Sequence, residues 1–101
     1  MNEVEFRNWM QVNNINRKMQ SDIISRLKKI EREIENCDID EQYRKDKCNL
    51  LMSLFLNMGI NERMKEHTNA DLPIGKYYMS AFRYAIKKYI LFCEDTISNH
   101  K

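Results

Sequence analysis

The chain has 101 residues, of which 43% are hydrophobic and 32% are charged, and its formal net charge is +2. This length predicts a single helical domain over residues 1–101 with one core, and this composition excludes a disordered chain and a membrane protein. The apolar runs are far shorter than the ~20 residues that cross a bilayer, and the acidic, alternating start is unlike a signal peptide, so we expect a cytoplasmic protein.

The first segment with helical spacing follows directly on the start of the chain. Asn2 and Glu5 fit a capping box, in which two side chains satisfy backbone N–H groups at a helix start. The apolar side chains behind them recur at i, i+3 and i+4, as on one face of a helix. They are Phe6, Trp9 and Met10. We therefore expect a helix that runs to about Gln11 and ends at Asn13 and Asn14.

The next stretch has the clearest helical pattern. Its apolar side chains recur in steps of three and four, which places them on one side of a helix of about five turns. They are Ile15, Met19, Ile23, Leu27, Ile30 and Ile34, with Ile24 beside them. Most of the cations of this stretch fall on the opposite side. They include Arg17, Lys18, Arg26 and Lys29.

An acidic cluster of Asp38, Asp40 and Glu41 precedes the third helix. Asp38 and Glu41 form a second candidate capping box. We assign the cluster to capping rather than to a cation site, because it lacks the glycine and the bidentate glutamate of a calcium loop. The helix that follows is expected to continue to Gly59. Its second half is apolar nearly all round, as in the most buried helix of a bundle.

The remaining chain predicts a short helix over 61–66, a loop over 67–75 and a last helix over 76–98. The last helix has an apolar stripe of Tyr78, Phe82, Ala85, Ile86, Tyr89 and Cys93, broadened by Ile90 and Phe92. A separate basic line runs along it through Lys76, Arg83, Lys87 and Lys88. Together the segments predict an all-α fold, a compact bundle of four main helices plus one short helix.

The sequence offers little that could serve catalysis. Cys37, Cys48 and Cys93 are odd in number and show no CxxC spacing, so we expect neither a disulfide framework nor a zinc site, and we place Cys48 and Cys93 in the core. His67 and His100 have no nucleophile at a recognisable spacing. We therefore predict a binding protein rather than an enzyme, with no cofactor, no metal and no small-molecule substrate.

Two segments carry the positive charge. The formal net charge is +2 for residues 16–35 and +3 for residues 76–101, whereas it is −2 for residues 36–75. If the two basic helices lie side by side, their cations could flank a DNA phosphate backbone, and about 4–6 contacts would give salt-dependent binding. The residues concerned are Arg17, Lys18, Arg26, Lys29, Lys76, Arg83, Lys87 and Lys88. The alternative is a solvated helix face balanced by nearby carboxylates.

Two adjacent tyrosines add to this hypothesis. Neighbouring helix residues point about 100° apart, so we expect either Tyr77 or Tyr78 to face outward beside Lys76. We choose Tyr77 as the candidate that stacks on a base or hydrogen-bonds a phosphate. The alternative is an exposed tyrosine without a function.

A second hypothesis is a protein-interaction module. The many methionine and aromatic residues make apolar stripes broader than one bundle needs, which could leave a patch for a partner. Such a module could be a phage or mobile-element protein that binds or inhibits a host protein, or it could form a helical homodimer.

Both ends of the chain resemble a known family. The residues that carry the resemblance are the opening Phe6-Arg7-Asn8-Trp9-Met10 and the closing helix Tyr78-Met79-Ser80-Ala81-Phe82-Arg83-Tyr84-Ala85-Ile86-Lys87-Lys88-Tyr89-Ile90-Leu91-Phe92-Cys93-Glu94. They are similar to the N-terminal core-binding domain of tyrosine recombinases, the phage integrases. The resemblance covers little of the middle of the chain.

This resemblance implies a four- to five-helix domain that clamps DNA. The matching DNA-facing residues would be Arg17, Lys18, Arg26, Lys76, Arg83 and Lys87. The chain departs from the family at Gln20, Ser21 and Ile24, where threonine and tyrosine are usual, and in its acidic stretch 38–46. Recombinase activity is not expected of the chain as given, because the family's catalytic residues do not follow.

Overall fold

The computed structural model describes residues 1–34, 37–55 and 76–99. Its helices are α1 (Glu3–Val12), α2 (Arg17–Glu33), α3 (Ile39–Asp46), α4 (Asn49–Ser53) and α6 (Lys76–Asn99). These residues contain no strand, which confirms the predicted all-α class. The helix predicted over 61–66 and the loop predicted over 67–75 lie outside the described residues. Among the described residues the short helix is α4.

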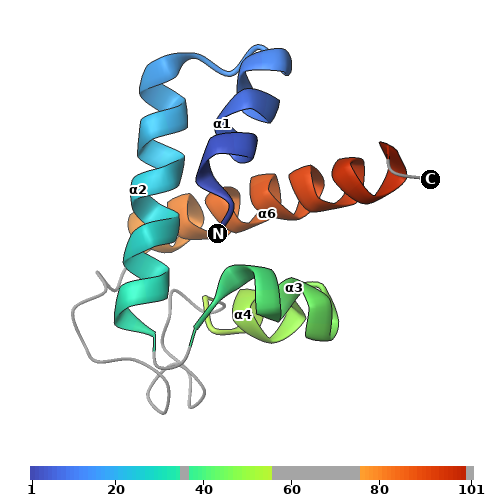
Figure 1. The fold of residues 1–101 in the computed structure, drawn as a ribbon. Helices are drawn as coiled ribbons and strands as arrows, with labels where there is room; N and C mark the ends of the chain where they lie inside the picture. Colours follow the sequence, from blue (N-terminus) through green and yellow to red (C-terminus); the bar gives the residue numbers. More distant parts are fainter. Residues whose placement is uncertain (35–36, 56–75, 100–101) are drawn as a thin grey trace.

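The helices form a hairpin, a long crossing helix and a small third unit (Figure 1). α1 and α2 lie antiparallel, side by side, and α6 crosses them and packs against both. α3 and α4 pack against each other beside the N-terminus. The radius of gyration of 13.4 Å is close to the ~13 Å of a compact domain of about 100 residues.

The α1–α2 hairpin starts at the predicted N-cap residue, Asn2, but the start is held in a different way. The Asn2 side chain makes no capping hydrogen bond, so the predicted Asn2–Glu5 capping box is wrong. The Asn2 backbone N–H instead donates to the Tyr89 hydroxyl at 2.8 Å, which ties α1 to α6. The turn between the helices uses Asn14 at a left-handed φ of 62°. Asn16 then caps α2, its side chain accepting the Met19 N–H at 2.8 Å.

The apolar stripe of α2 is confirmed from Ile23 to Ile34, but it is wrong at its beginning. Met19 is 38% exposed, whereas its neighbour Gln20 is only 4% exposed. The Gln20 amide is satisfied where it lies, because it donates to the Ile15 carbonyl at 2.7 Å and to the Gln11 side chain. A polar side chain with partners is therefore buried in the place predicted for a methionine.

The third predicted helix is broken in two. Lys47 and Cys48 both adopt left-handed φ values, of 57° and 66°, so α3 ends at Asp46 and α4 begins at Asn49. In one continuous helix Ile39 and Cys48 would stand about 180° apart. The break turns the second half, so that Ile39 and Cys48 are both buried. Asp38 caps α3 as predicted, its side chain accepting the Asp40 N–H at 3.0 Å. The Glu41 half of the predicted capping box is not formed, and the Glu41 carboxylate pairs with Lys45 instead.

Aromatic rings join α1 to α6 in the core. Phe6 is fully buried, with the ring of Tyr89 at 4.9 Å edge-on and that of Phe92 at 5.3 Å. Trp9, predicted to be a core residue, is half-buried, and its indole N–H donates to the Asp95 carboxylate at 2.8 Å. The predicted core therefore holds here, with Trp9 closing its edge.

A second aromatic contact and one cysteine complete the core. Phe82 is buried as predicted and Phe55 is buried as well; their ring centres lie 5.6 Å apart, and they join the end of α4 to α6. Cys48 is fully buried, as predicted, whereas Cys93 is half-buried at the edge of the core.

Candidate functional site

The cations predicted on α2 are exposed or half-buried, and no ion pair to a carboxylate is formed by them among the described residues. Arg17 and Lys18 are exposed, and Arg26 and Lys29 are half-buried. None of the four forms an ion pair within the described parts of the chain. They do not share one face, however, because Arg17 and Arg26 stand about 180° apart around the axis. Lys18, Arg26 and Lys29 lie within about 80° of one another and form what we call the α2 basic face.

Arg83, predicted to contact DNA, has a structural role. Its guanidinium donates to the Phe55 carbonyl at 2.7 Å and to the Ser80 hydroxyl at 3.3 Å. The first of these bonds satisfies a backbone carbonyl just after α4 and holds α4 against α6. Arg83 still contributes positive charge, because neither partner is a carboxylate, but its donors are partly committed to the fold.

The other predicted residues of α6 differ in what they offer. Lys87 is exposed and has no ion pair in the described chain. Lys88 is half-buried, with its ammonium 5.4 Å from the centre of the Tyr84 ring, a cation–π arrangement. Lys76 and Tyr77 lie in the first turn of α6, and their side chains fall outside the description.

The two basic helices cross rather than run side by side. In Figure 1, α2 runs from top to bottom and α6 passes across it. The two helices are in contact, but their rows of cations follow different directions. The predicted arrangement, two parallel basic rows along one phosphate backbone, is therefore not what the fold provides. Each row is a separate basic surface.

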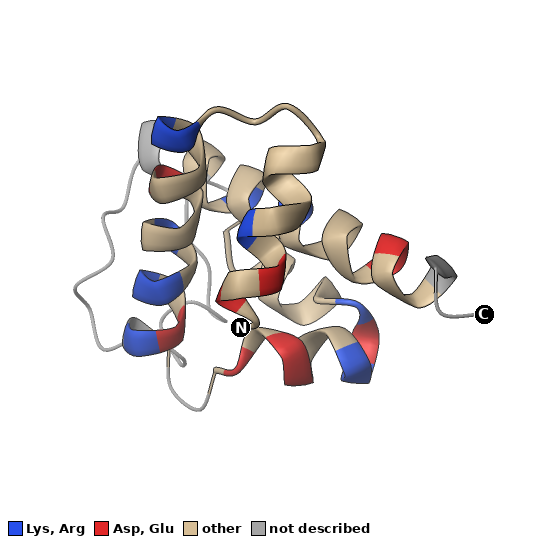
Figure 2. Ribbon diagram, turned by 45° about the horizontal axis from the view of Figure 1, so that its top comes forward, with Lys and Arg blue, Asp and Glu red and all other residues tan. Residues whose placement is uncertain are grey.

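One carboxylate, Asp22, lies on the α2 basic face, one turn after Lys18 and one turn before Arg26. Figure 2 shows basic residues repeated along α2 with acidic residues between them, and further acidic residues at the start of α1, on α3 and near the end of α6. Glu3 pairs with Lys28 at 2.8 Å and with Arg7 at 3.3 Å, and the hydrogen bond from Lys28 lowers the pKa of Glu3. Lys45 pairs with Glu41 at 3.3 Å within α3. These pairs neutralise Glu3 between α1 and α2 and Glu41 on α3.

The acidic cluster before α3 binds the chain's own α-amino group. The Met1 ammonium lies 3.2 Å from a carboxylate oxygen of Glu31 and 3.2 Å from one of Asp40, with Asp38 at 3.9 Å. Burial lowers the pKa of this amine, but hydrogen bonds and charge from Asp40 and Glu31 outweigh it and raise the pKa above 8.0. The acidic cluster therefore has two roles: Asp38 caps α3, as predicted, and the carboxylates of Asp38 and Asp40 also bind the Met1 ammonium.

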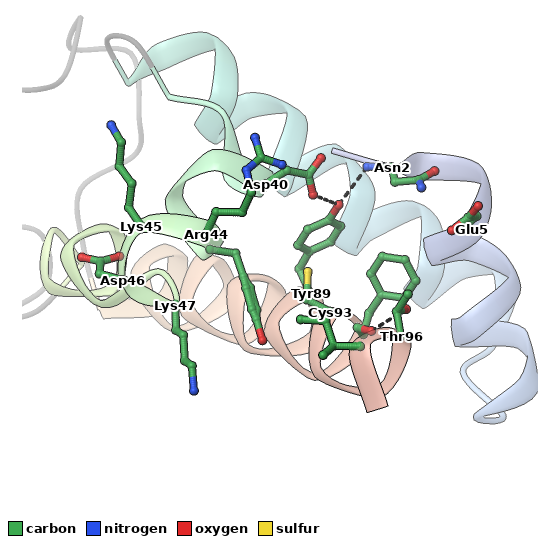
Figure 3. A pocket seen from close by; sticks show the side chains of 13 residues that line it. Asn2, Glu5, Asp40, Arg44, Lys45, Asp46, Lys47, Tyr89, Cys93 and Thr96 are labelled. Atoms are coloured by element: carbon green, nitrogen blue, oxygen red, sulfur yellow. Dashed lines mark hydrogen bonds between the residues drawn. The ribbon is translucent and has the colours of Figure 1, made fainter. Parts of the chain in front are cut away.

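A groove of about 770 Å³ opens beside this network, between the start of α1, α3 and the second half of α6 (Figure 3). Its apolar surface comes from Tyr43, Tyr89, Phe92, Cys93 and Ile97. The Tyr89 hydroxyl lies at one end, where it accepts from the Asn2 backbone and donates to Asp40.

The two sides of the groove differ in the charge of their residues. Arg44 and Lys47, at the α3 side, are exposed and have no ion pair among the described residues. Glu5 stands on the α1 side. Asp46 accepts the Leu50 N–H through one oxygen at 3.0 Å, while its other oxygen is buried without a hydrogen-bond partner in the described chain.

The cysteines are poorly suited to nucleophilic chemistry. Burial raises the pKa of Cys93, in the groove, to about 11, and the pKa of both Cys37 and Cys48 to about 12. Thiols of this kind are protonated at neutral pH and are weak nucleophiles. Among the described residues no group of three His, Cys, Asp and Glu side chains could hold a metal ion. His67 and His100 lie outside the described residues.

Comparison of the chain with protein-family models, curated proteins and solved structures found no match. The resemblance to the recombinase core-binding domain therefore stays a prediction. No helix in the described part of the chain is long and apolar enough to span a membrane.

Two features were missed from the sequence. The groove combines residues from three segments far apart in the chain, so no local pattern could indicate it. Tyr84 was also missed, although a signal was present, because it falls outside the apolar stripe of α6. The structure places it 42% exposed.

Proposed function

We propose that this chain is a non-enzymatic DNA-binding helical module that contacts the phosphate backbone through its basic helix faces. The observation that carries the proposal is the α2 basic face. Lys18, Arg26 and Lys29 point away from the buried stripe of α2. Asp22 shares their side of the helix, but none of the three cations forms an ion pair within the described residues. Cations held in this way are available to phosphates.

The physical basis is the release of counterions. Each phosphate that a lysine or arginine neutralises frees condensed cations, so affinity falls steeply with salt. Lys87 and Lys88 on α6 provide a second group of contacts, and Arg17 adds a cation on another side of α2. The resemblance to a DNA-clamping domain supports the same conclusion, since Arg17, Lys18 and Arg26 match its DNA-facing helix.

The test is a double charge reversal on α2, Lys18→Glu with Lys29→Glu. We expect the affinity for duplex DNA to fall at least ten-fold, because two phosphate contacts become repulsions, and the salt slope of log K to shrink by about 2. Fluorescence anisotropy at several salt concentrations measures both. Arg83 is left unchanged, because replacing it would break its bond to the Phe55 carbonyl.

The matched control is Arg44→Glu with Lys45→Glu on α3. It changes the net charge equally but lies among carboxylates. It should weaken duplex binding much less. Equal losses in the two variants would show a general charge effect, and no binding by the unchanged protein at low salt would refute the proposal.

The groove favours a second candidate function, a protein-interaction module. Its apolar surface and the uncompensated Arg44 and Lys47 suit an amphipathic helix with carboxylates along one edge. Synthetic helical peptides with glutamate or with lysine at that edge would be titrated against the protein and followed by NMR. We expect only the glutamate peptide to shift groove resonances, and Ile97→Asp to abolish the shifts. Equal behaviour of the two peptides would contradict this candidate.

A further inference from the structure

The outward side of α6 carries a tyrosine that the core does not use. Among the described aromatic residues, Tyr84 alone is classed as exposed, with 42% of its surface accessible. Ser80 and Leu91, one turn before and two turns after it, are exposed as well. An aromatic ring that stays outside a core containing six buried aromatic side chains has a face available for a ligand.

The surroundings of Tyr84 are positively charged. The Lys88 ammonium lies 5.4 Å from the centre of the Tyr84 ring. The preceding residue, Lys87, is exposed. From Lys76 to Cys93 the sequence contains four cations and no carboxylate. The first carboxylates, Glu94 and Asp95, come after Leu91. The ring is therefore flanked by two lysines that form no ion pair among the described residues, on a part of α6 whose own sequence has no carboxylate.

This combination is the one that proteins use to bind single-stranded nucleic acid. Bases stack on aromatic side chains, while cations contact the backbone between them, and the binding tolerates many sequences because every base has a π face. In a duplex the faces of the bases are covered by their neighbours. An exposed ring therefore adds affinity for a single strand and little for a duplex.

We propose that the outer side of α6, formed by Tyr84, Lys87 and Lys88, binds single-stranded nucleic acid. One base stacks on the Tyr84 ring in the place where the Lys88 ammonium now lies. That ammonium then joins Lys87 on the adjoining phosphates. This inference rests on the proposed function, since it names a substrate class, but it uses a different surface from the α2 basic face.

The test compares two probes, a labelled oligothymidylate of about 12 nucleotides, within the usual site sizes, and a duplex of the same length. Tyr84→Ala should weaken binding of the single strand about ten-fold, the effect of losing one stacked base, and should change duplex binding less than two-fold. Tyr84→Phe keeps the ring and should bind the single strand as the unchanged protein does.

Leu91→Ala is the matched control, since it truncates an exposed apolar side chain on the same side of α6 and should leave both affinities unchanged. Thermal melting checks that each variant is folded. Unchanged single-strand binding by Tyr84→Ala would overturn this inference, as would an equal loss with Leu91→Ala. If only the α2 double variant loses duplex binding, the proposed function stands and this inference fails. If only Tyr84→Ala has an effect, the inference stands without the duplex proposal.

Discussion

The amide of Gln20 is a buried polar group at the turn between α1 and α2. It donates to the Ile15 carbonyl at 2.7 Å and to the Gln11 side chain at 3.0 Å. A buried carbonyl that loses its donor costs about 1–3 kcal/mol. The side chain of Gln20 therefore helps to hold the two helices of the hairpin together.

At the residue scale we expect losses of stability of unequal size from two neighbouring substitutions. Gln20→Ala should lower the free energy of unfolding by about 1–3 kcal/mol, since it leaves the Ile15 carbonyl without its donor. Met19→Ala should cost less than about 1 kcal/mol, because that side chain is exposed. Urea denaturation measures both. A larger loss for Met19→Ala would mean that methionine, and not glutamine, faces the core.

At the scale of elements, the break between α3 and α4 determines how the middle of the chain packs. Lys47 and Cys48 hold left-handed backbone angles, which cost about 1–2 kcal/mol for residues with a Cβ. The burial of Cys48, Leu51 and Phe55 against the core offsets this cost. Arg83 then fastens the end of α4 by its bond to the Phe55 carbonyl.

Replacing Lys47 by glycine tests the break. Glycine adopts positive φ without strain, so Lys47→Gly should raise the free energy of unfolding by up to about 1 kcal/mol. The melting temperature would then rise by about 4–8 °C per kcal/mol. In an unbroken helix the same change would lower stability by about 0.5–1 kcal/mol. Lys45→Gly, inside α3, is the control and should be destabilising.

At the scale of the whole molecule, the α-amino group joins three segments. It pairs with Glu31 near the end of α2 and with Asp40 at the start of α3, while Asn2 holds Tyr89 of α6. Glu31 also accepts the Ile39 N–H at 3.1 Å. The position of α3, and with it one wall of the groove, therefore depends on this charged network.

The raised pKa of the amine makes stability depend on pH. An amine with a higher pKa in the folded chain stabilises the fold fully below its ordinary pKa of 8.0, and this contribution is lost as pH rises through the folded value. The thiols, with raised pKa values, lose their contribution only above their ordinary 9.0. We expect the melting temperature to begin to fall near pH 8, before the thiols ionise.

Acetylation of the Met1 amine separates the effect of the amine on stability from that of the thiols. It removes the positive charge, so the acetylated chain should lose about 1 kcal/mol at neutral pH, as for a favourable exposed ion pair. Between pH 8.0 and 9.0 its melting temperature should then fall less than that of the unmodified chain, because the amine no longer titrates. A parallel fall in both forms would show that the amine contributes nothing.

Local sequence patterns were enough to predict the helices whose apolar residues stay on one face along the whole helix. The spacing within residues 17–33 and 76–99 predicted α2 and α6 closely, because one helical face had to be buried in each. The continuous helix predicted after Asp38 was wrong, because its stripe changes phase by about half a turn at Lys47 and Cys48. That change was visible in the spacing, but only the packing shows that the backbone breaks there.

The amino-acid sequence by itself determined the all-α class, the long helices and which residues carry charge, since these depend on spacing and residue type within a few turns. Tertiary structure alone decided that α2 and α6 cross, that Arg83 bonds to a backbone carbonyl, that the acidic cluster holds the α-amino group and that a groove opens beside it. Each of these depends on contacts between residues far apart in the chain. Spacing along one helix contains no information about the direction of the next, and so the basic residues could be named but not assembled into one surface.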